Sequence, residues 1–193
     1  MSTLLSVILI VAVLILMWGI RAYNKLIALI EAIKNNKRQI DIQLDRRFKV
    51  FESLIEAVKK YMDYEKTTLK DVVTLRNQAQ AAKAEGNEPA RIAAEEGISQ
   101  IASNLSVVFE QYPELQAGEN VFQLQEEIVN TENKLAYSKQ AYNNEIERYY
   151  ALKKSFFEAL VVSFFAEKLD VYFEYWGLPD EQIKSQENYT VKL

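Results

Sequence analysis

Hydrophobic residues recur every three or four positions along most of the chain, and polar residues fill the positions between them. From Ile40 to Met62 the steps between apolar residues are 4, 4, 3, 4, 3 and 4, which is the spacing of one face of an α-helix. No stretch alternates with a period of two, so the pattern contains no strand signal. The chain is therefore predicted to be all-α.

Breaks in the pattern divide the chain after residue 20 into four predicted helices. The first covers residues 21–84, with a weak point at 34–41, and it ends at 85–89, because Gly86 suits a helix end and Pro89 a helix start. The others cover residues 89–112, 121–154 and 156–176, with a turn at 112–120. The predicted fold is a long antiparallel up-and-down bundle of about four helices, residues 21–176, followed by a polar tail, residues 177–193.

The fourth predicted helix, residues 156–176, is apolar on nearly every side. A helix with this composition is either buried at the centre of a bundle or lies at a membrane surface. We favour the central position, and the sequence leaves open whether this helix contacts lipid.

The first twenty residues contain no charged side chain and form a nearly unbroken aliphatic run. As a helix the run is about 30 Å long, which matches the hydrocarbon core of a bilayer, and Trp18 and Tyr23 stand at one end, where aromatic side chains prefer the headgroup level. A cleaved signal peptide carries basic residues before its apolar run, and a buried core helix is the other alternative. We predict a membrane anchor over residues 1–20. Its lipid-facing residues include Leu4, Leu5, Ile8, Ile10, Leu14, Ile15, Leu16, Trp18 and Ile20.

Basic residues are concentrated directly after the anchor. Residues 21–49 hold eight Lys or Arg against three acids. Such an excess stays on the cytoplasmic side, so we expect the N-terminus outside and the rest of the chain in the cytoplasm. The same residues either attract anionic lipid headgroups or only set the topology.

Composition excludes several classes of function. The chain has no Cys and no His, so thiol nucleophiles, zinc sites, catalytic triads and His-containing di-iron sites are absent. A formal charge of −4 opposes nucleic-acid binding, and no glycine-rich phosphate loop is present. We predict no catalytic, metal or cofactor site and no small-molecule substrate. The adjacent acids Glu95–Glu96 and Glu126–Glu127 point about 100° apart on a helix, which does not suit a shared metal. Glu65 and Glu132 are a possible carboxylate pair between helices, and Arg47 and Arg76 explain the same residues equally well.

Polar side chains also interrupt the third predicted helix close to its apolar stripe. At 100° per residue, Glu132, Lys139 and Asn143 fall within about 60° of the line through Ile128, and Thr131 lies on the other flank. We expect Glu132 and Lys139 to meet opposite charges; ordinary solvated flanks are the alternative. The candidate polar packing layer consists of Arg47, Glu65, Arg76, Glu132, Lys139 and Asn143.

Several ordered segments resemble the LemA family of bacterial membrane-anchored helical proteins. They are RAYNKL at 21–26, IDIQLDRRF at 40–48, YPELQA at 112–117, FQLQEEI at 122–128 and TENKLAYSKQAYN at 131–143. The resemblance implies a bundle behind one membrane helix, in the bacterial cytoplasmic membrane, with HtpX-type membrane metalloproteases as associated proteins. The motif residues carried over are Tyr23, Asn24, Arg46, Arg47, Tyr112, Pro113, Thr131, Glu132, Asn133, Tyr142 and Asn143. Departures at Glu52, Tyr149–Tyr150 and Phe157 indicate a divergent branch.

The predicted function is that of a non-enzymatic, membrane-anchored scaffold or adaptor. A first helix over 21–84 would be about 95 Å long, and the second helix could cover only about 36 Å of it. The uncovered stripe is the candidate association seam, formed by Leu26, Ile30, Ile33, Ile40 and Leu44. We expect a homo-oligomer through this seam, as a small coiled assembly, a ring or a cage. The alternatives are docking to a membrane protease and membrane remodelling.

Overall fold

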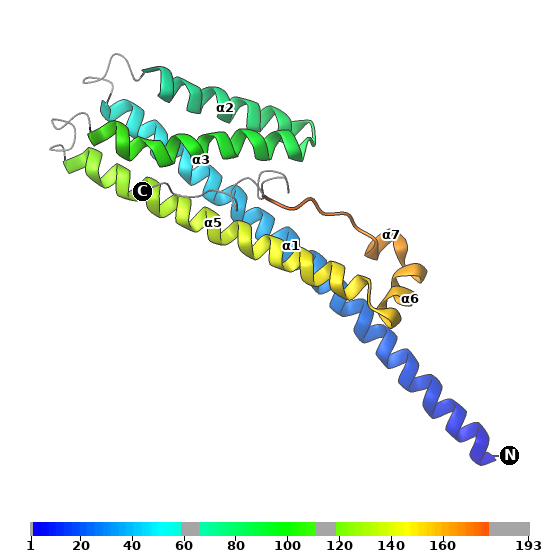
Figure 1. Cartoon of the computed structure of the whole chain (residues 1–193). Coiled ribbons are helices and arrows are strands. Elements are labelled where there is room, and N and C mark those ends of the chain that lie inside the picture. The colour runs from blue at the N-terminus through cyan, green and yellow to red at the C-terminus, as the bar shows by residue number, and fades with distance from the viewer. Residues whose placement is uncertain (1, 59–65, 111–118, 178–193) are drawn as a thin grey trace, which may run out of the picture. The chain divides into compact units, whose positions relative to one another are not determined.

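A computed structural model describes residues 2–58, 66–110 and 119–177, with side chains over 3–57, 70–103 and 121–177, and every regular element in these ranges is a helix. The helices are α1 (Ser2–Val58), α2 (Lys66–Ala84), α3 (Glu88–Glu110), α5 (Glu119–Lys153), α6 (Phe156–Phe164) and α7 (Ala166–Leu169) (Figure 1). The predicted all-α class is confirmed. The described chain forms two compact units. The first contains Met1–Arg38 and Gln140–Tyr175, and the second contains Gln39–Lys139 and Trp176–Leu193.

In the second unit, α2 runs antiparallel to the end of α1. Arg76 of α2 pairs with Asp45 of α1. Lys83 lies about two turns further along α2, and it pairs with Asp41, which lies about one turn earlier on α1. The prediction of one helix over residues 21–84 is therefore wrong. The reversal buries the apolar face of α2, because Val72 packs in one core cluster with residues of α1. That burial stabilises the folded-back arrangement more than helix continuation would.

The turn between α2 and α3 follows the prediction for residues 85–89. Gly86 has a positive φ of 72°, its N–H donates to the carbonyl of Lys83, and the N–H of Asn87 donates to the carbonyl of Ala82, which together form a Schellman motif. The Asn87 side chain then accepts a hydrogen bond from the N–H of Ala90 (3.2 Å) and caps α3.

The core of the second unit takes side chains from four helices of the described ranges. Its buried members are Val50, Phe51 and Leu54 of α1, Val72 of α2, Ile98 of α3, and Val121 and Ile128 of α5. Helices α2 and α3 approach closely at Gly97, where an added Cβ would stand 3.0 Å from a methyl group of Leu75. The up-and-down bundle is thus present, and its core fixes which face each helix turns inward.

The candidate association seam is buried by the chain itself. In the first unit α1 and α5 lie antiparallel, with Asn36 donating to the carbonyl of Ala141 (3.4 Å). Leu26, Ile30 and Ile33 are buried in this unit, and Ile40 and Leu44 are buried in the second. The prediction that this stripe is uncovered is wrong, because the length comparison considered only the second helix. The helix that covers the stripe is α5, which has 35 residues.

The fourth predicted helix, 156–176, is also wrong in its length. Helix α6 ends at Phe164 and α7 at Leu169, and residues 170–174 then follow α5 without helical structure. Tyrosine hydroxyls of α5 replace the helical hydrogen bonds. The N–H of Val171 donates to the hydroxyl of Tyr149 (2.9 Å), and the N–H of Phe173 donates to that of Tyr150 (2.9 Å). Tyr142 donates to the carbonyl of Glu174 (2.9 Å).

The central position favoured for this segment is contradicted by the exposure of α6. Val161 and Val162 are buried, yet Phe156, Phe157 and Phe164 are exposed. The physical reason is that α1 and α5 already bury each other's apolar faces, so that α6 can cover only one edge of them.

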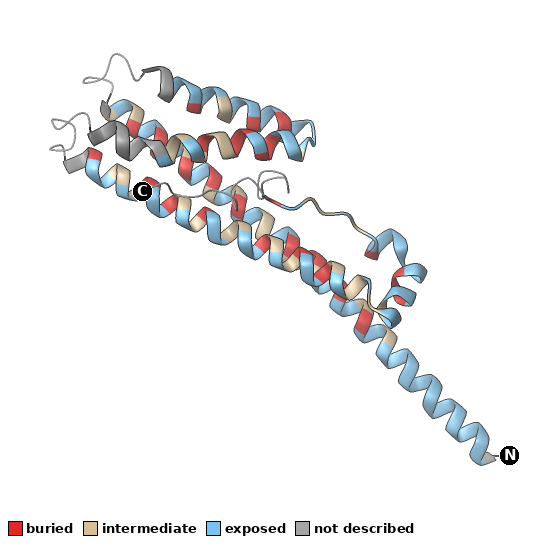
Figure 2. Ribbon diagram, in the orientation of Figure 1, coloured by how far each residue is buried: buried red, intermediate tan, exposed pale blue. Residues whose placement is uncertain are grey.

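The start of α1 is the one described helix long and apolar enough to cross a membrane. None of its membrane-length apolar window is buried, so it is not a core helix, and Figure 2 shows this part of α1 exposed throughout. It is a candidate membrane anchor. Helix α1 also continues through residues 34–41, so Asn35 and Asn36 do not break it.

Removing one tyrosine hydroxyl at a time tests how residues 169–174 are held. Tyr149→Phe leaves the N–H of Val171 without its acceptor, and Tyr150→Phe does the same for Phe173. A lost hydrogen bond of about 1 kcal/mol should speed amide exchange about fivefold at the affected residue. Residue-resolved hydrogen exchange should show each variant affecting its own amide more than the other. Equal exchange in both variants and the unmodified chain would contradict this account.

Candidate functional site: a buried network of ion pairs

The centre of the second unit holds a buried arginine, Arg47 of α1, whose side chain is only 1% exposed. Its guanidinium forms an ion pair with Glu95 of α3, whose side chain is 2% exposed, and it also donates to the Glu95 carbonyl (3.2 Å). Buried charges are tolerated only when they are paired and hydrogen-bonded. The pair therefore fixes α1 against α3 at one register.

The same guanidinium reaches α5. Nη1 of Arg47 donates to Oγ of Ser99 (2.8 Å) and to Oε1 of Glu132 (3.2 Å), and the Ser99 hydroxyl donates to Oε2 of Glu132 (2.9 Å). Arg47 thus links three helices, with Ser99 bridging α3 and α5. The predicted opposite charge for Glu132 is present, and it is Arg47.

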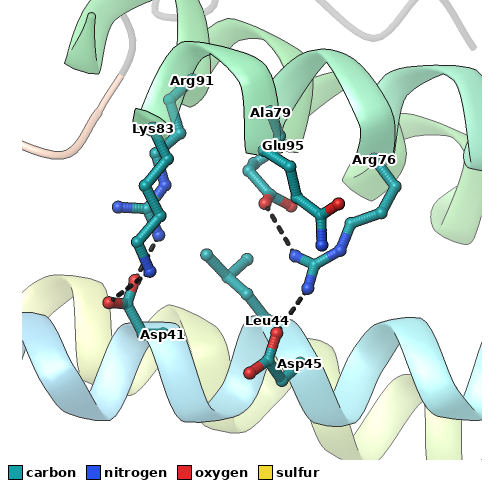
Figure 3. A pocket seen from close by; sticks show the side chains of 9 residues that line it. Asp41, Leu44, Asp45, Arg76, Ala79, Lys83, Arg91 and Glu95 are labelled. Atoms are coloured by element: carbon teal, nitrogen blue, oxygen red, sulfur yellow. Dashed lines mark hydrogen bonds and ion pairs between the residues drawn. The ribbon is translucent and has the colours of Figure 1, made fainter. Parts of the chain in front are cut away.

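Arg76 brings α2 into the network. It forms an ion pair with Asp45 of α1 and approaches Glu95 of α3 (3.5 Å), and its guanidinium stacks on the ring of Phe48 at 5.1 Å from the centroid. Figure 3 shows Arg76 between the two carboxylates, with Leu44 beside them. Glu95 consequently contacts two arginines from two different helices.

A second cluster lies on the same face of α1, around Asp41. Lys83 of α2 (2.9 Å) and Arg91 of α3 both donate to its carboxylate (Figure 3). Burial by itself would raise the pKa of Asp41, but the hydrogen bonds from Lys83 and Arg91 outweigh it and hold the pKa below its usual value. A small polar crevice of about 110 Å³ separates this cluster from Arg76.

Lys139 of α5 closes the network, together with an aromatic ring. It forms an ion pair with Glu96 of α3, so its predicted opposite charge is also present. The ring of Trp176 is buried and contacts two cations. The guanidinium carbon of Arg91 is 5.1 Å from the ring centroid, and Nζ of Lys139 is 5.9 Å from it. Cation–π contacts of this kind stabilise a desolvated ring and charge together.

Charges in this network balance. Among the described side chains of the second unit, six cations pair with six carboxylates across helices. The cations are Arg46, Arg47, Arg76, Lys83, Arg91 and Lys139, and the carboxylates are Asp41, Asp45, Glu95, Glu96, Glu127 and Glu132. Each carboxylate has a cation at ion-pair distance, and this arrangement suits the fixing of helix register more than proton transfer.

Most of the remaining predicted site residues can also be placed. Tyr23 packs its ring against Phe165 at 5.1 Å, Asn24 and Asn133 are exposed, and Asn143 is half-buried. Thr131 is fully buried, deeper than its predicted flank position, and its hydroxyl has no hydrogen-bond partner among the described residues. Three predicted residues, Glu65, Tyr112 and Pro113, lie outside the described side chains.

The network contains residues that the sequence pattern did not single out. Glu95 and Glu96 were considered only as adjacent acids unsuited to sharing a metal, and Asp41, Ser99, Lys83 and Arg91 received no role. The signal that points to Glu95 is its spacing to Ile92 and Ile98 on the buried face of α3. A carboxylate at such a position requires a cation on a neighbouring helix.

Comparison with known proteins gives one family. The model of the LemA family matches residues 36–187, which is more than half of the 193-residue chain. No curated protein matches the sequence.

Two adjacent glutamates provide a matched test of the network. Glu95→Gln leaves Arg47 without its fully buried carboxylate and should lower the free energy of unfolding by about 3 kcal/mol. Glu96→Gln removes a pair whose side chains keep 16% and 25% of their surface exposed, and it should cost no more than about 1 kcal/mol. Urea unfolding in detergent, followed by circular dichroism, measures both. The double variant Arg47→Met/Glu95→Met should recover part of the loss, and equal losses for the two single variants would refute the assignment.

Asp41 gives the network a defined dependence on pH. Because its pKa is lowered in the folded state, its contribution to stability is complete above the unfolded-state value of about 3.9 and is lost as the pH falls through the lower folded-state value. The unfolding free energy of the unmodified chain minus that of Asp41→Asn should therefore be constant from neutral pH to about pH 5 and shrink below about pH 4. A difference that grows on acidification would contradict the ion pairs.

Proposed function

The chain belongs to the LemA family, and from that premise we propose that it is a non-enzymatic, membrane-anchored scaffold that associates with further copies of itself. The start of α1 is the anchor, with the bundle in the cytoplasm. The charged residues of the network in the second unit are paired between helices, which supports a structural role for them. The binding surface must then lie elsewhere on the bundle.

One observation carries the proposal: an apolar groove on the second unit that the described residues leave uncovered. It lies between α3 and α5 and has a volume of about 490 Å³. Its apolar lining consists of Ala102 of α3 and Phe122, Ile128 and Val129 of α5, and its polar lining consists of Ser103, Gln125, Glu126, Asn130 and Asn133. Phe122 is 57% exposed and Val129 60% exposed. Grooves of this kind accept one apolar face of a partner helix. The predicted seam is replaced by this surface, because the seam residues are buried.

A second copy of the chain is the occupant we favour. Membrane anchoring confines copies to two dimensions and raises their effective concentration, so that a modest apolar patch is sufficient for association. A two-fold symmetric dimer, the commonest arrangement, would bring the same patch of each copy together. Polar neighbours such as Gln125 and Asn133 at the groove fit the rim of a reversible interface. The alternative occupant is a membrane protease of the type that the family resemblance implies.

The absence of cysteine from the chain makes a clean crosslinking test available. In native membranes under mild oxidation, Val129→Cys should form a disulfide-linked dimer, because a two-fold axis that passes through the groove brings the two copies of this residue together. Gln123→Cys is the matched control, since it is exposed on the same helix about 120° away from Val129. Non-reducing electrophoresis measures the dimer fraction.

The two variants separate the competing outcomes. Dimer from Val129→Cys and not from Gln123→Cys supports self-association through the groove. Equal dimer from both would indicate random collision and would refute the proposed surface. A photo-crosslinker on the same cysteine that yields one foreign adduct, with no dimer, would favour the protease alternative.

A further inference from the structure

An apolar groove also lies between α1 and α6 in the first unit. It has a volume of about 510 Å³, and its walls are Ile15, Leu16 and Gly19 of α1 and Leu160 and Phe164 of α6. At Gly19 a Cβ would meet no atom within 4 Å, so this glycine leaves the groove open. The groove is apolar, and its walls offer almost no polar group to a ligand.

The position of the groove along α1 is defined by two aromatic contacts. Phe157 of α6 packs edge-on against Trp18 (5.6 Å between ring centroids), and Phe165 packs against Tyr23 (5.1 Å). The first charged residue of α1 is Arg21, between these two contacts. Helix α6 therefore stands beside the last turns of the uncharged run, at the depth where a membrane-spanning helix leaves the hydrocarbon.

The outer face of α6 is a set of uncovered phenylalanines. Phe164 is 83% exposed and Phe156 is 79% exposed, and no described residue covers them. A contiguous apolar face of this kind marks an interaction site. Arg21 and Lys25 are the first two charged residues of α1, and both are exposed. At 100° per residue they lie on the other side of α1 from Gly19, and they mark the level at which lipid headgroups begin.

We propose that α6 lies in the membrane leaflet on the side of Arg21, and that its groove with α1 holds one acyl chain of a phospholipid. This inference rests on the proposed anchoring by α1. One wall of the groove is the anchor itself, so its occupant must come from within the bilayer. An acyl chain matches the apolar lining of the groove, and Arg21 and Lys25 mark the level of the headgroups along α1. Helix α6 then acts as a short second membrane contact next to the anchor.

Photolabelling from the lipid side tests this placement. The full chain is reconstituted in vesicles of phosphatidylethanolamine and phosphatidylglycerol that contain a phospholipid with a diazirine on its acyl chain. After irradiation, mass spectrometry should find label on the peptide that contains Leu160 and Phe164, and on the anchor around Leu9. Peptides around Tyr137, which is exposed on the bundle, should carry none.

Two substitutions of Gly19 then test the groove itself. Gly19→Phe places a ring in the open space and should lower labelling at Leu160 by about fivefold or more, since a filled groove has no room for an acyl chain. Gly19→Ala leaves the groove open and should label like the unmodified chain. Label on Leu9 should stay the same in both variants.

Each result decides a separate point. If the anchor is labelled and α6 carries no more label than the peptides around Tyr137, the inference is wrong and the anchoring stands. An unlabelled anchor would overturn both. Equal labelling of Leu160 in Gly19→Phe and in the unmodified chain would overturn the groove as the lipid site. If α6 is unlabelled and Leu160→Cys forms disulfide-linked dimers, a second copy fills the groove and the lipid assignment is wrong.

Discussion

The bundle depends on one interaction more than on any other, the ion pair between Arg47 and Glu95. Both side chains are almost completely buried, so neither charge can be solvated if the helices shift. A slip of one turn between α1 and α3 would leave two unpaired charges in the core, which costs several kcal/mol. Hydrophobic residues at helical spacing can slide past one another at much lower cost. The ion pair therefore selects the register, and the apolar core supplies the stability.

This constraint also acts on the helix that carries the candidate membrane anchor, because Arg47 belongs to α1. The same helix carries the candidate anchor at its start, and it contains neither Gly nor Pro between Gly19 and Val58. The anchor and the network are thus parts of one uninterrupted helix. A protein that exchanges substrates through a moving lid needs flexible joints. An unbroken helix is consistent with the scaffold role proposed above.

The sequence predicted those features that each helix determines by itself. The bounds of α5, the Gly86 turn and the inward direction of Glu132 and Lys139 all follow from local pattern and helical geometry. It did not predict the return of α2 along α1, because no Gly or Pro marks that reversal and the gain arises only when α2 buries its apolar face. It also missed partners such as Glu95. An ion pair between two helices depends on how the helices are aligned with each other, and the pattern of a single helix does not determine that alignment.

The aromatic segment after α5 shows why composition alone misjudged the fourth helix. Tyrosine and phenylalanine have similar hydrophobic rings, but only tyrosine has a hydroxyl that can bind backbone groups. Where Tyr149 and Tyr150 provide hydroxyls, the backbone of residues 171–173 leaves the helix and stays hydrogen-bonded. Helix α6 keeps its hydrogen bonds within the helix to its end, where the N–H of Phe165 donates to the carbonyls of Val161 and Val162. The tyrosine hydroxyls of α5 therefore replace helical hydrogen bonds only at residues 171–173, after α7 has ended.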